Sequence, residues 1–193
     1  MSVAFDRLHV LTGGPGSGKT TLIEALRDAG HAGMIEAGRG VIRDQVSIGG
    51  SALPWLDPLL FAELMLSWDM RSYQAALSHE GPVFFDRGVP DVVGYLRLMG
   101  MPVPTHMERA AQEFRYCRRV FIAPPWREIF ENDLERRQDF DEAVLTYETL
   151  VETYPDYGYE LVELPRSTVS ERVRFVIGAI AARRTFDPPR RGG

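Results

Sequence analysis

One segment near the start of the chain constrains the fold more than any other feature of the sequence. It reads Gly13-Gly14-Pro15-Gly16-Ser17-Gly18-Lys19-Thr20 and matches the pattern G-x-x-x-x-G-K-[ST] at every specified position. A short apolar run, residues 8–11, precedes it, and apolar residues follow at helical spacing until Gly30 ends the helix. A strand, a glycine-rich loop and a helix in this order favour a phosphate-binding P-loop over a plain turn.

Each residue type in this loop has a physical role toward a nucleotide. The glycines let successive backbone N–H groups face the β-phosphate at the positive end of a helix. Lys19, the sole lysine among 22 basic residues, is expected to bridge the β- and γ-phosphates. The Thr20 hydroxyl is expected to bind Mg²⁺. Nucleotide contacts are predicted from Gly13, Gly14, Pro15, Gly16, Ser17, Gly18, Lys19, Thr20 and Thr21.

The composition excludes several classes of protein. The 193 residues are 45% hydrophobic and 25% charged, which is typical of a globular domain. A net charge of −5 argues against nucleic acid as a partner, because proteins that bind it generally need a basic surface. No apolar run reaches the roughly 20 residues of a membrane span. Cys117 is the single cysteine, so we expect a cytoplasmic protein without an internal disulfide. A monomer or a homodimer is expected as the oligomeric state.

The rest of the chain alternates short apolar runs with helical patterns, as expected for an α/β protein with a parallel sheet. After the first strand, strands are predicted at 34–35, 83–85, 120–122 and 161–162. Helices are predicted at 38–48, 55–79, 89–99, 105–115, 127–135, 140–154 and 169–184. No linker separates these elements, so residues 1–184 are predicted to form one domain and residues 185–193 a flexible tail.

Two acids stand where predicted strands end, and functional groups gather at the carboxyl ends of parallel strands. Asp86 ends the hydrophobic run 83–85, so it is predicted to lie near the Mg²⁺ ion. Glu36 follows the second strand, and either acid is a candidate base for the chemistry. The alternatives are a helix N-cap for Asp86 and a solvated acid at a helix start for Glu36. Arg39 and Arg87 are predicted to contact substrate, or else to form surface ion pairs.

Taken together, these motifs resemble the predicted ATPase/kinase family that includes nicotinamide riboside kinase-type domains. The resemblance rests on the P-loop, on segments 36–39, 86–91 and 133–137, and on segments 157–165 and 171–173. It implies a three-layer P-loop NTPase fold of the nucleoside and nucleotide kinase branch, with helices on both faces of a five-stranded parallel sheet in the order 2-3-1-4-5. The family is functionally mixed, so the resemblance does not name a substrate.

The resemblance also implies site residues outside the P-loop. It places a small arginine-bearing lid at 133–137, where Arg136 or Arg137, together with Arg127, would neutralise the transferring phosphoryl group. The alternative for this segment is a charged helix face. Pro165, in the loop after the last strand, would flank the adenine, although turn chemistry alone also favours proline there. Asp91 is expected to bind substrate.

Relatives of this kind build the acceptor site between the second and third strands. Trp55, beside a Gly- and Pro-rich break, is the better candidate for contact with a ring-bearing acceptor. The apolar positions between Phe61 and Trp68 have a spacing that fits a core-facing stripe better than a ligand contact.

These observations predict an Mg²⁺-dependent kinase that uses ATP to phosphorylate a hydroxyl of a nucleoside-like or other small acceptor. Lys19, Glu36, Asp86 and Arg136 are the expected catalytic residues. ATP is favoured over GTP because the chain lacks the N-K-x-D tetrapeptide of many GTPases. The alternative is a nucleotide-binding regulatory ATPase, or switch, which would use the same loop and need no acceptor pocket.

Overall fold

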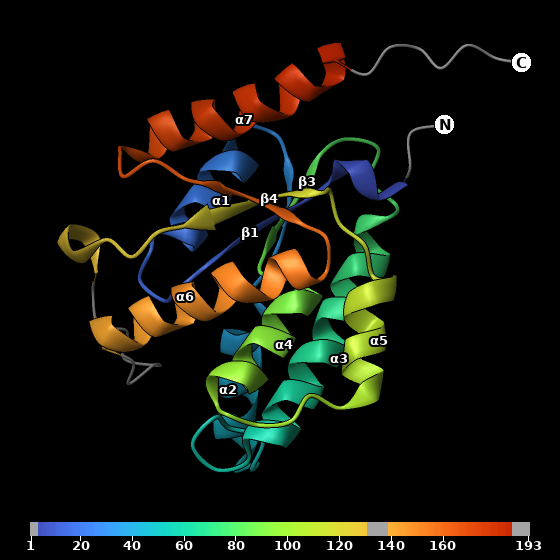
Figure 1. Cartoon of the computed structure of the whole chain (residues 1–193), viewed down its shortest axis with the longest axis vertical. Coiled ribbons are helices and arrows are strands. Elements are labelled where there is room, and N and C mark those ends of the chain that lie inside the picture. Colours follow the sequence, from blue (N-terminus) through green and yellow to red (C-terminus); the bar gives the residue numbers. More distant parts are fainter. Residues whose placement is uncertain (1–3, 131–138, 187–193) are drawn as a thin grey trace, which may run out of the picture.

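The computed structural model describes residues 4–130 and 139–186, and its centre is a parallel sheet (Figure 1). The strands are β1 (Leu8–Gly13), β2 (Ala32–Met34), β3 (Val83–Asp86), β4 (Arg119–Ala123) and β5 (Glu160–Glu163). They pair in the order β2-β3-β1-β4-β5, and every pairing is parallel. This arrangement confirms the predicted fold class and strand order.

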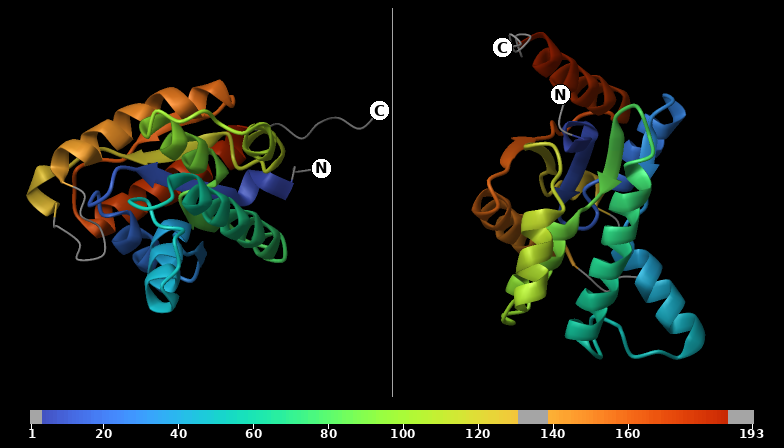
Figure 2. Two further views of the ribbon diagram at one scale, coloured as in Figure 1. Left: turned by 90° about the horizontal axis from the view of Figure 1, so that it is seen from below. Right: turned by 90° about the vertical axis from the view of Figure 1, so that its right-hand side faces the viewer.

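Helices cover both faces of the sheet, which gives three layers (Figure 2). They are α1 (Lys19–Asp28), α2 (Ala37–Ile48), α3 (Pro58–Ala76), α4 (Val89–Leu98), α5 (Thr105–Glu113), α6 (Phe140–Asp156) and α7 (Val169–Phe186). Two short 3-10 turns, η1 (Ala4–Arg7) and η2 (Arg127–Ile129), complete the described elements.

Alternation of side chains along the strands separates two hydrophobic cores. In β3, Val83 and Phe85 face the helices α2 to α6, whereas Phe84 faces α1 and α7. Successive side chains of a strand point to opposite faces, so a run that is apolar throughout must be covered on both sides. The larger core therefore lies under α2 to α6, and the smaller core lies under α1 and α7.

The predicted element boundaries need four corrections. The second strand ends at Met34, because Ile35 already turns outward and is exposed. The third helix begins at Pro58, not at residue 55, because Asp57 caps it by accepting a hydrogen bond from the Leu60 amide. The predicted helix 127–135 is wrong where the structure describes it: only η2 forms, and its C-cap Phe130 has an extended backbone. The final helix continues to Phe186, two residues beyond the predicted end at residue 184.

The carboxyl ends of β1 and β3 lie side by side and define one edge of the sheet. Leu11 of β1 pairs in register with Asp86, the last residue of β3. The P-loop leaves β1 at this edge, and α2 begins there after Glu36. In open parallel sheets this edge is where ligands bind, so it is the place to look for the site.

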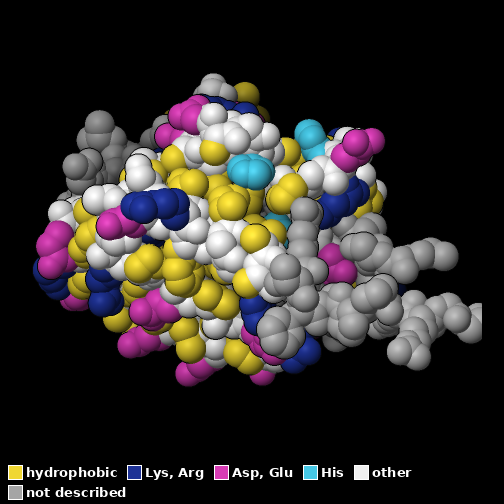
Figure 3. All heavy atoms as spheres, turned by 90° about the horizontal axis from the view of Figure 1, so that it is seen from above, with side chains coloured by type: hydrophobic (Ala, Val, Ile, Leu, Met, Phe, Trp, Pro, Cys, Tyr) yellow, Lys and Arg dark blue, Asp and Glu magenta, His cyan; other side chains and the backbone are white. Residues whose placement is uncertain are grey.

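The described part of the surface shows no concentration of basic groups on the face that carries α7. Acidic and basic side chains alternate there with hydrophobic ones (Figure 3). Among the described residues, no helix combines the length and the apolarity that crossing a membrane requires.

Candidate active site

The loop between β1 and α1 has the geometry that the motif predicts. Gly18 precedes α1 with a φ of 76°, in the left-handed region that favours glycine. A Cβ atom at Gly14 would lie 2.2 Å from the carbonyl oxygen of Ala143 in α6, so only glycine fits at this close approach. The loop therefore packs directly against the start of α6, and its shape depends on that contact.

The Lys19 side chain is buried over the loop. Its Nζ atom donates hydrogen bonds to the Gly14 carbonyl oxygen at 2.7 Å and to the Ser17 hydroxyl at 3.1 Å. The Ser17 hydroxyl donates in turn to the same Gly14 carbonyl at 2.8 Å. These contacts place the only lysine ammonium of the chain against the backbone that is expected to hold phosphate.

Thr20 and Asp86 meet at the first turn of α1. The Thr20 hydroxyl donates a hydrogen bond to Oδ2 of Asp86 at 2.9 Å, while Oδ1 of Asp86 is buried and has no hydrogen-bond partner among the described residues. Burial first, and then the nearby Glu36 carboxylate, raise the pKa of Asp86. Asp86 does not cap α4, because Gly88 is the N-cap of that helix.

These oxygens fit a hydrated Mg²⁺ ion, which takes oxygen ligands and binds through one or two protein groups and nucleotide phosphates. The described residues contain no cluster of three or more His, Cys, Asp or Glu side chains that could hold a metal ion alone. A cation at Thr20 and Asp86 would therefore depend on the phosphates of a bound nucleotide.

Glu36, Arg39 and Arg87 form a charged group beside the P-loop. Oε1 of Glu36 accepts from Nε of Arg87 at 3.0 Å, and Oε2 lies 3.3 Å from Nε of Arg39. Glu36 is buried, so it is not a solvated acid. Of its two partners, Arg87 is mostly buried, whereas the Arg39 side chain is 38% exposed. Burial lowers the pKa of Arg87, but the carboxylates of Glu36 and Asp91 outweigh that effect and raise it above its ordinary value.

Asp91 holds this group in place. Its Oδ1 accepts from the Thr12 hydroxyl at 2.6 Å and from Arg87 at 3.1 Å. Its Oδ2 accepts from the Gly88 amide at 2.9 Å and from the Tyr154 hydroxyl at 2.6 Å. Four donors use the acceptor capacity of this carboxylate, so its geometry is that of a positioning residue. Arg87 has a φ of 73°, a strained value for a residue with a side chain, and Asp91 helps to fix it.

A cavity of about 440 Å³ opens next to these residues. At one end it is lined by Pro15 of the P-loop, Glu36 and Arg87; its walls come from α2, α3, α4 and α6. The apolar wall residues include Ile42, Phe61, Met65, Val92, Leu98 and Leu150. Trp55 also lines it and is 51% exposed, as expected for a residue at the mouth. Phe61 and Met65 are buried, which confirms the predicted core stripe, and they face the cavity as well.

The structure shows three candidate site residues that sequence reasoning did not identify. Asp69 and Tyr95 line the cavity, from α3 and α4. Arg172 of α7 is buried, and its Nη1 donates to the Ser17 carbonyl oxygen at 3.1 Å. The sequence held one signal for Asp69, because it follows Phe61 and Met65 at four-residue spacing and places an acid on an apolar stripe. Arg172 lies 155 residues from the loop that it contacts, and only the fold brings them together.

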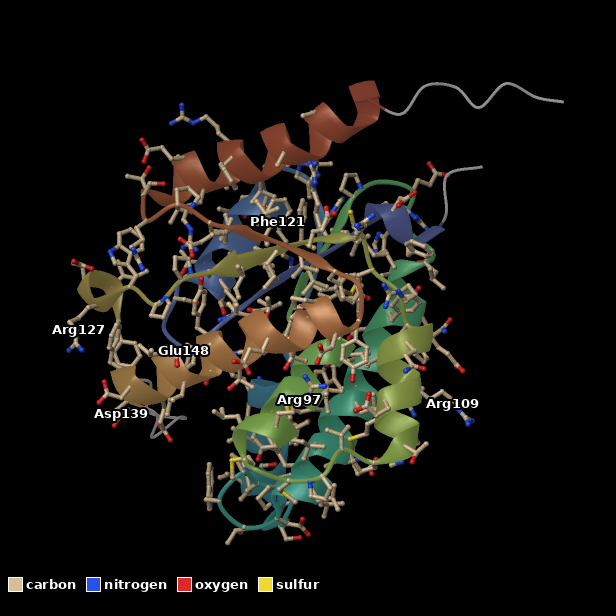
Figure 4. All side chains as sticks on the ribbon, in the orientation of Figure 1. Arg97, Arg109, Phe121, Arg127, Asp139 and Glu148 are labelled. Atoms are coloured by element: carbon tan, nitrogen blue, oxygen red, sulfur yellow. The ribbon has the colours of Figure 1, made fainter. Side chains whose placement is uncertain are left out.

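Other predicted residues lie apart from this centre or outside the described part of the chain. Arg136, Arg137 and the predicted lid 133–137 fall outside the described residues. Arg127 stacks over the Phe140 ring at 4.1 Å and lies at the same end of the molecule as Asp139 (Figure 4). Pro165 follows β5 and Thr21 is exposed on α1, and the predicted nucleotide contacts of both remain predictions.

Comparison with known proteins identifies the family of the chain. A family model described as an AAA domain, AAA_28, matches residues 8–172. No curated protein sequence matches the chain.

Similar folds occur among solved structures. NadR protein in complex with NR has a TM-score of 0.67 at 17% identity, over 97% of this chain and 53% of that one, so our chain spans about half of it. Deoxyadenosine kinase from M.mycoides has a TM-score of 0.67 at 12% identity, over 91% and 99% of the two chains. Thymidylate kinase from Candida albicans has a TM-score of 0.69 at 12% identity, over 94% and 93%.

At these identities the likeness concerns the fold. The family model, in contrast, spans most of the chain and ends at Arg172. The chain thus belongs to the AAA_28 family of AAA domains, with the P-loop fold shared by nucleoside and nucleotide kinases.

Proposed function

We propose that this protein is a small-molecule kinase that transfers the γ-phosphoryl group of ATP to a hydroxyl of a nucleoside-like acceptor. One observation carries the proposal: a cavity of about 440 Å³ begins at the P-loop and at Glu36 and continues between the helices of the larger core. A cavity of this size and apolar lining suits a small organic ligand. A nucleotide-operated switch needs the loop but has no use for this adjoining cavity.

The residues of the site divide the work of phosphoryl transfer. Backbone N–H groups of the loop and Lys19 orient the β- and γ-phosphates, while Thr20 and Asp86 would hold the Mg²⁺ ion. That ion supplies neutralisation of the charge that develops on the phosphate oxygens. The loop after β5, where Pro165 lies and the Ser167 hydroxyl is buried without a partner among the described residues, is our proposed contact for the adenine.

Glu36 is our candidate for the group that accepts the proton of the acceptor hydroxyl. Its carboxylate lies at the junction of the P-loop and the cavity, and Arg39 and Arg87 fix both of its oxygens. A base held in one orientation lowers the cost of aligning the attacking hydroxyl with the phosphorus. Arg87 would also bring positive charge to the acceptor end of the site.

The test is release of ADP from Mg·ATP in the presence of nucleosides, nucleotides, vitamins, sugars and aminoglycoside-like alcohols. A kinase raises ADP output with one class of compound and yields its phosphorylated product in equal amount. Slow ADP release that no compound changes would contradict the proposal and favour the regulatory ATPase.

A variant of Lys19 serves as the matched control for this assay. Lys19→Arg keeps the charge, yet a wide planar guanidinium cannot reproduce the contacts of Nζ inside the loop. We expect turnover to fall by about 100-fold or more, because a contact to the transferring group is lost. Arg27→Lys, on the exposed last turn of α1, should leave turnover unchanged. Full activity in Lys19→Arg would show that ADP release does not depend on this loop.

A further inference from the structure

The ionisable residues that line the cavity are mostly acids. Among the described residues they are Glu36, Asp69, Asp91 and Glu142, with Arg87 as the single base. Arg87 is already bonded to Glu36 at 3.0 Å and to Asp91 at 3.1 Å. An acceptor that carried a phosphate group would bring further negative charge to this acidic wall. The Arg87 guanidinium is already paired with two carboxylates and would offset that charge poorly.

Asp69 is the acid whose position has no structural explanation. It lies on α3, one turn after Met65 and two turns after Phe61, and it is only 6% exposed. No described residue donates a hydrogen bond to it or pairs with it, although buried carboxylates normally require such partners. Burial first, and then the carboxylates of Asp91 and Glu36, raise its pKa, while Arg87 acts in the opposite direction.

A second polar group in the same cavity also lacks a partner. The Tyr95 hydroxyl is buried without a hydrogen bond to any described residue, and burial raises the pKa of Tyr95 to about 12. Its ring meets the Phe61 ring edge-on, with centroids 5.4 Å apart. The cavity therefore combines aromatic walls with two polar groups that are not satisfied by the protein, a pattern typical of ligand recognition.

From these observations we propose that the acceptor is a nucleoside-like compound without a phosphate group, and that Asp69 accepts a hydrogen bond from an N–H group on its ring. Phe61, Met65 and Tyr95 provide the apolar surface for that ring. Asp69 is then a specificity-determining residue that selects an amino-bearing ring. This inference rests on the proposed kinase function and narrows its acceptor.

The first experiment compares acceptors at a fixed concentration of Mg·ATP. The probes are cytidine and adenosine, their analogues without the exocyclic amino group (2-pyrimidinone riboside and purine riboside), and their 5′-monophosphates. We expect at least one amino nucleoside to raise ADP release, with kcat/KM about 10-fold or more above that of its analogue without the amino group. The monophosphates should have no effect on ADP release. Stimulation by a monophosphate instead would overturn this inference while leaving the kinase proposal intact.

Binding without ATP tests the inference independently of turnover. The same nucleosides should raise Tm in the absence of nucleotide, and cytidine 5′-monophosphate should raise it less than cytidine. If no compound releases ADP but this order of Tm shifts is found, the kinase proposal fails, while the inference that the cavity binds a nucleoside-like compound without a phosphate group stands. A larger Tm shift with cytidine 5′-monophosphate than with cytidine would overturn the inference.

Variants of Asp69 separate recognition from a structural role. Asp69→Leu should raise KM for the amino nucleoside by about 10- to 100-fold and leave KM for Mg·ATP unchanged, because a buried hydrogen bond between its ring and the carboxyl is lost. It should also raise the Tm of the free protein, since an unpartnered buried carboxyl is removed. Asp44→Asn is the control, because the Asp44 side chain is exposed on α2, and it should change neither KM. A fall in Tm together with an equal rise in KM for every acceptor would show that Asp69 has a structural role.

Discussion

At the scale of single residues, Glu36 and Asp86 are both buried acids near the P-loop, and their partners assign them different tasks. Asp86 bonds to Thr20, whereas Glu36, at the P-loop end of the cavity, bonds to Arg39 and Arg87. Asp86→Asn should therefore weaken Mg·ATP binding and turnover together. Glu36→Gln should leave Mg·ATP binding nearly intact and lower phosphoryl transfer by about 100- to 10,000-fold. Titration of Mg·ATP into both variants tests these two roles. A loss of Mg·ATP affinity in Glu36→Gln alone would show that the roles of Glu36 and Asp86 are reversed.

Asp69 predicts a pH dependence of the free energy of unfolding. In the folded state, burial and the carboxylates of Asp91, Glu36 and Asp86 raise its pKa well above the ordinary value of about 3.8, and Arg87 opposes this shift. Tyr116 also interacts with this carboxyl electrostatically. Because the folded state holds the proton more tightly, its stabilising contribution is complete below pH 3.8 and is lost as the pH rises through the folded pKa.

The measurement is urea unfolding of the wild type and of Asp69→Asn as a function of pH. The wild type should lose about 1.4 kcal/mol relative to the variant for each pH unit within that window. Parallel curves would show that the Asp69 carboxyl titrates normally.

At the scale of elements, α7 is joined to the P-loop by Arg172. Nη1 donates to the Ser17 carbonyl, Nε has no partner among the described residues, and burial lowers the pKa of the guanidinium. We expect Arg172→Met to raise KM for Mg·ATP by about 10-fold with a smaller change in kcat, because a loop that is less well held must be ordered by the nucleotide. Arg174→Met, exposed on the same helix, should change neither constant. If both variants change KM for Mg·ATP equally, the effect comes from the stability of α7 and not from the contact between Arg172 and the P-loop.

The elements also show what the sequence could and could not predict. The P-loop could be predicted because its motif has fixed spacing, and the strand order followed from the family resemblance. A parallel sheet also predicts that Glu36 and Asp86, each at a strand end, lie at one edge. The ion pair between Glu36 and Arg87 was not predicted and comes from the structure. The helix predicted at 127–135 rested on charge spacing, which a short turn satisfies equally. In the structure the Phe130 ring packs against Phe140 and would contact any Cβ at Gly16, and the helical turn has ended by then.

Side chains that act across long sequence distances could not be predicted. The apolar spacing of Phe61 and Met65 fits a buried stripe whether or not a cavity lies beside it. The cavity forms only where α2, α3, α4 and α6 come together, so the position of Asp69 beside it emerges from tertiary structure. The same holds for Tyr154, whose hydroxyl reaches Asp91 across 63 residues of sequence.

At the scale of the whole molecule, both cores share one sheet, and we expect the described elements to unfold together. Trp55 and Trp68 lie on the side of the larger core, and Trp126 lies next to η2. Urea unfolding followed by circular dichroism should give the same midpoint as tryptophan emission, both in the wild type and in a Trp126→Phe variant. Two separate midpoints would contradict the prediction of a single domain over residues 1–184.

The sheet also separates the helix that follows the P-loop from the walls of the cavity. The P-loop leads into α1, which packs with α7 on one face, while the walls of the cavity come from α2, α3, α4 and α6 on the other. Substitutions at cavity positions such as Ile42, Met65 and Leu98 leave the α1 and α7 face untouched. Under the proposed kinase function, a lineage with this architecture can therefore exchange one acceptor for another through substitutions in the cavity wall, while the residues that bind phosphate are inherited unchanged.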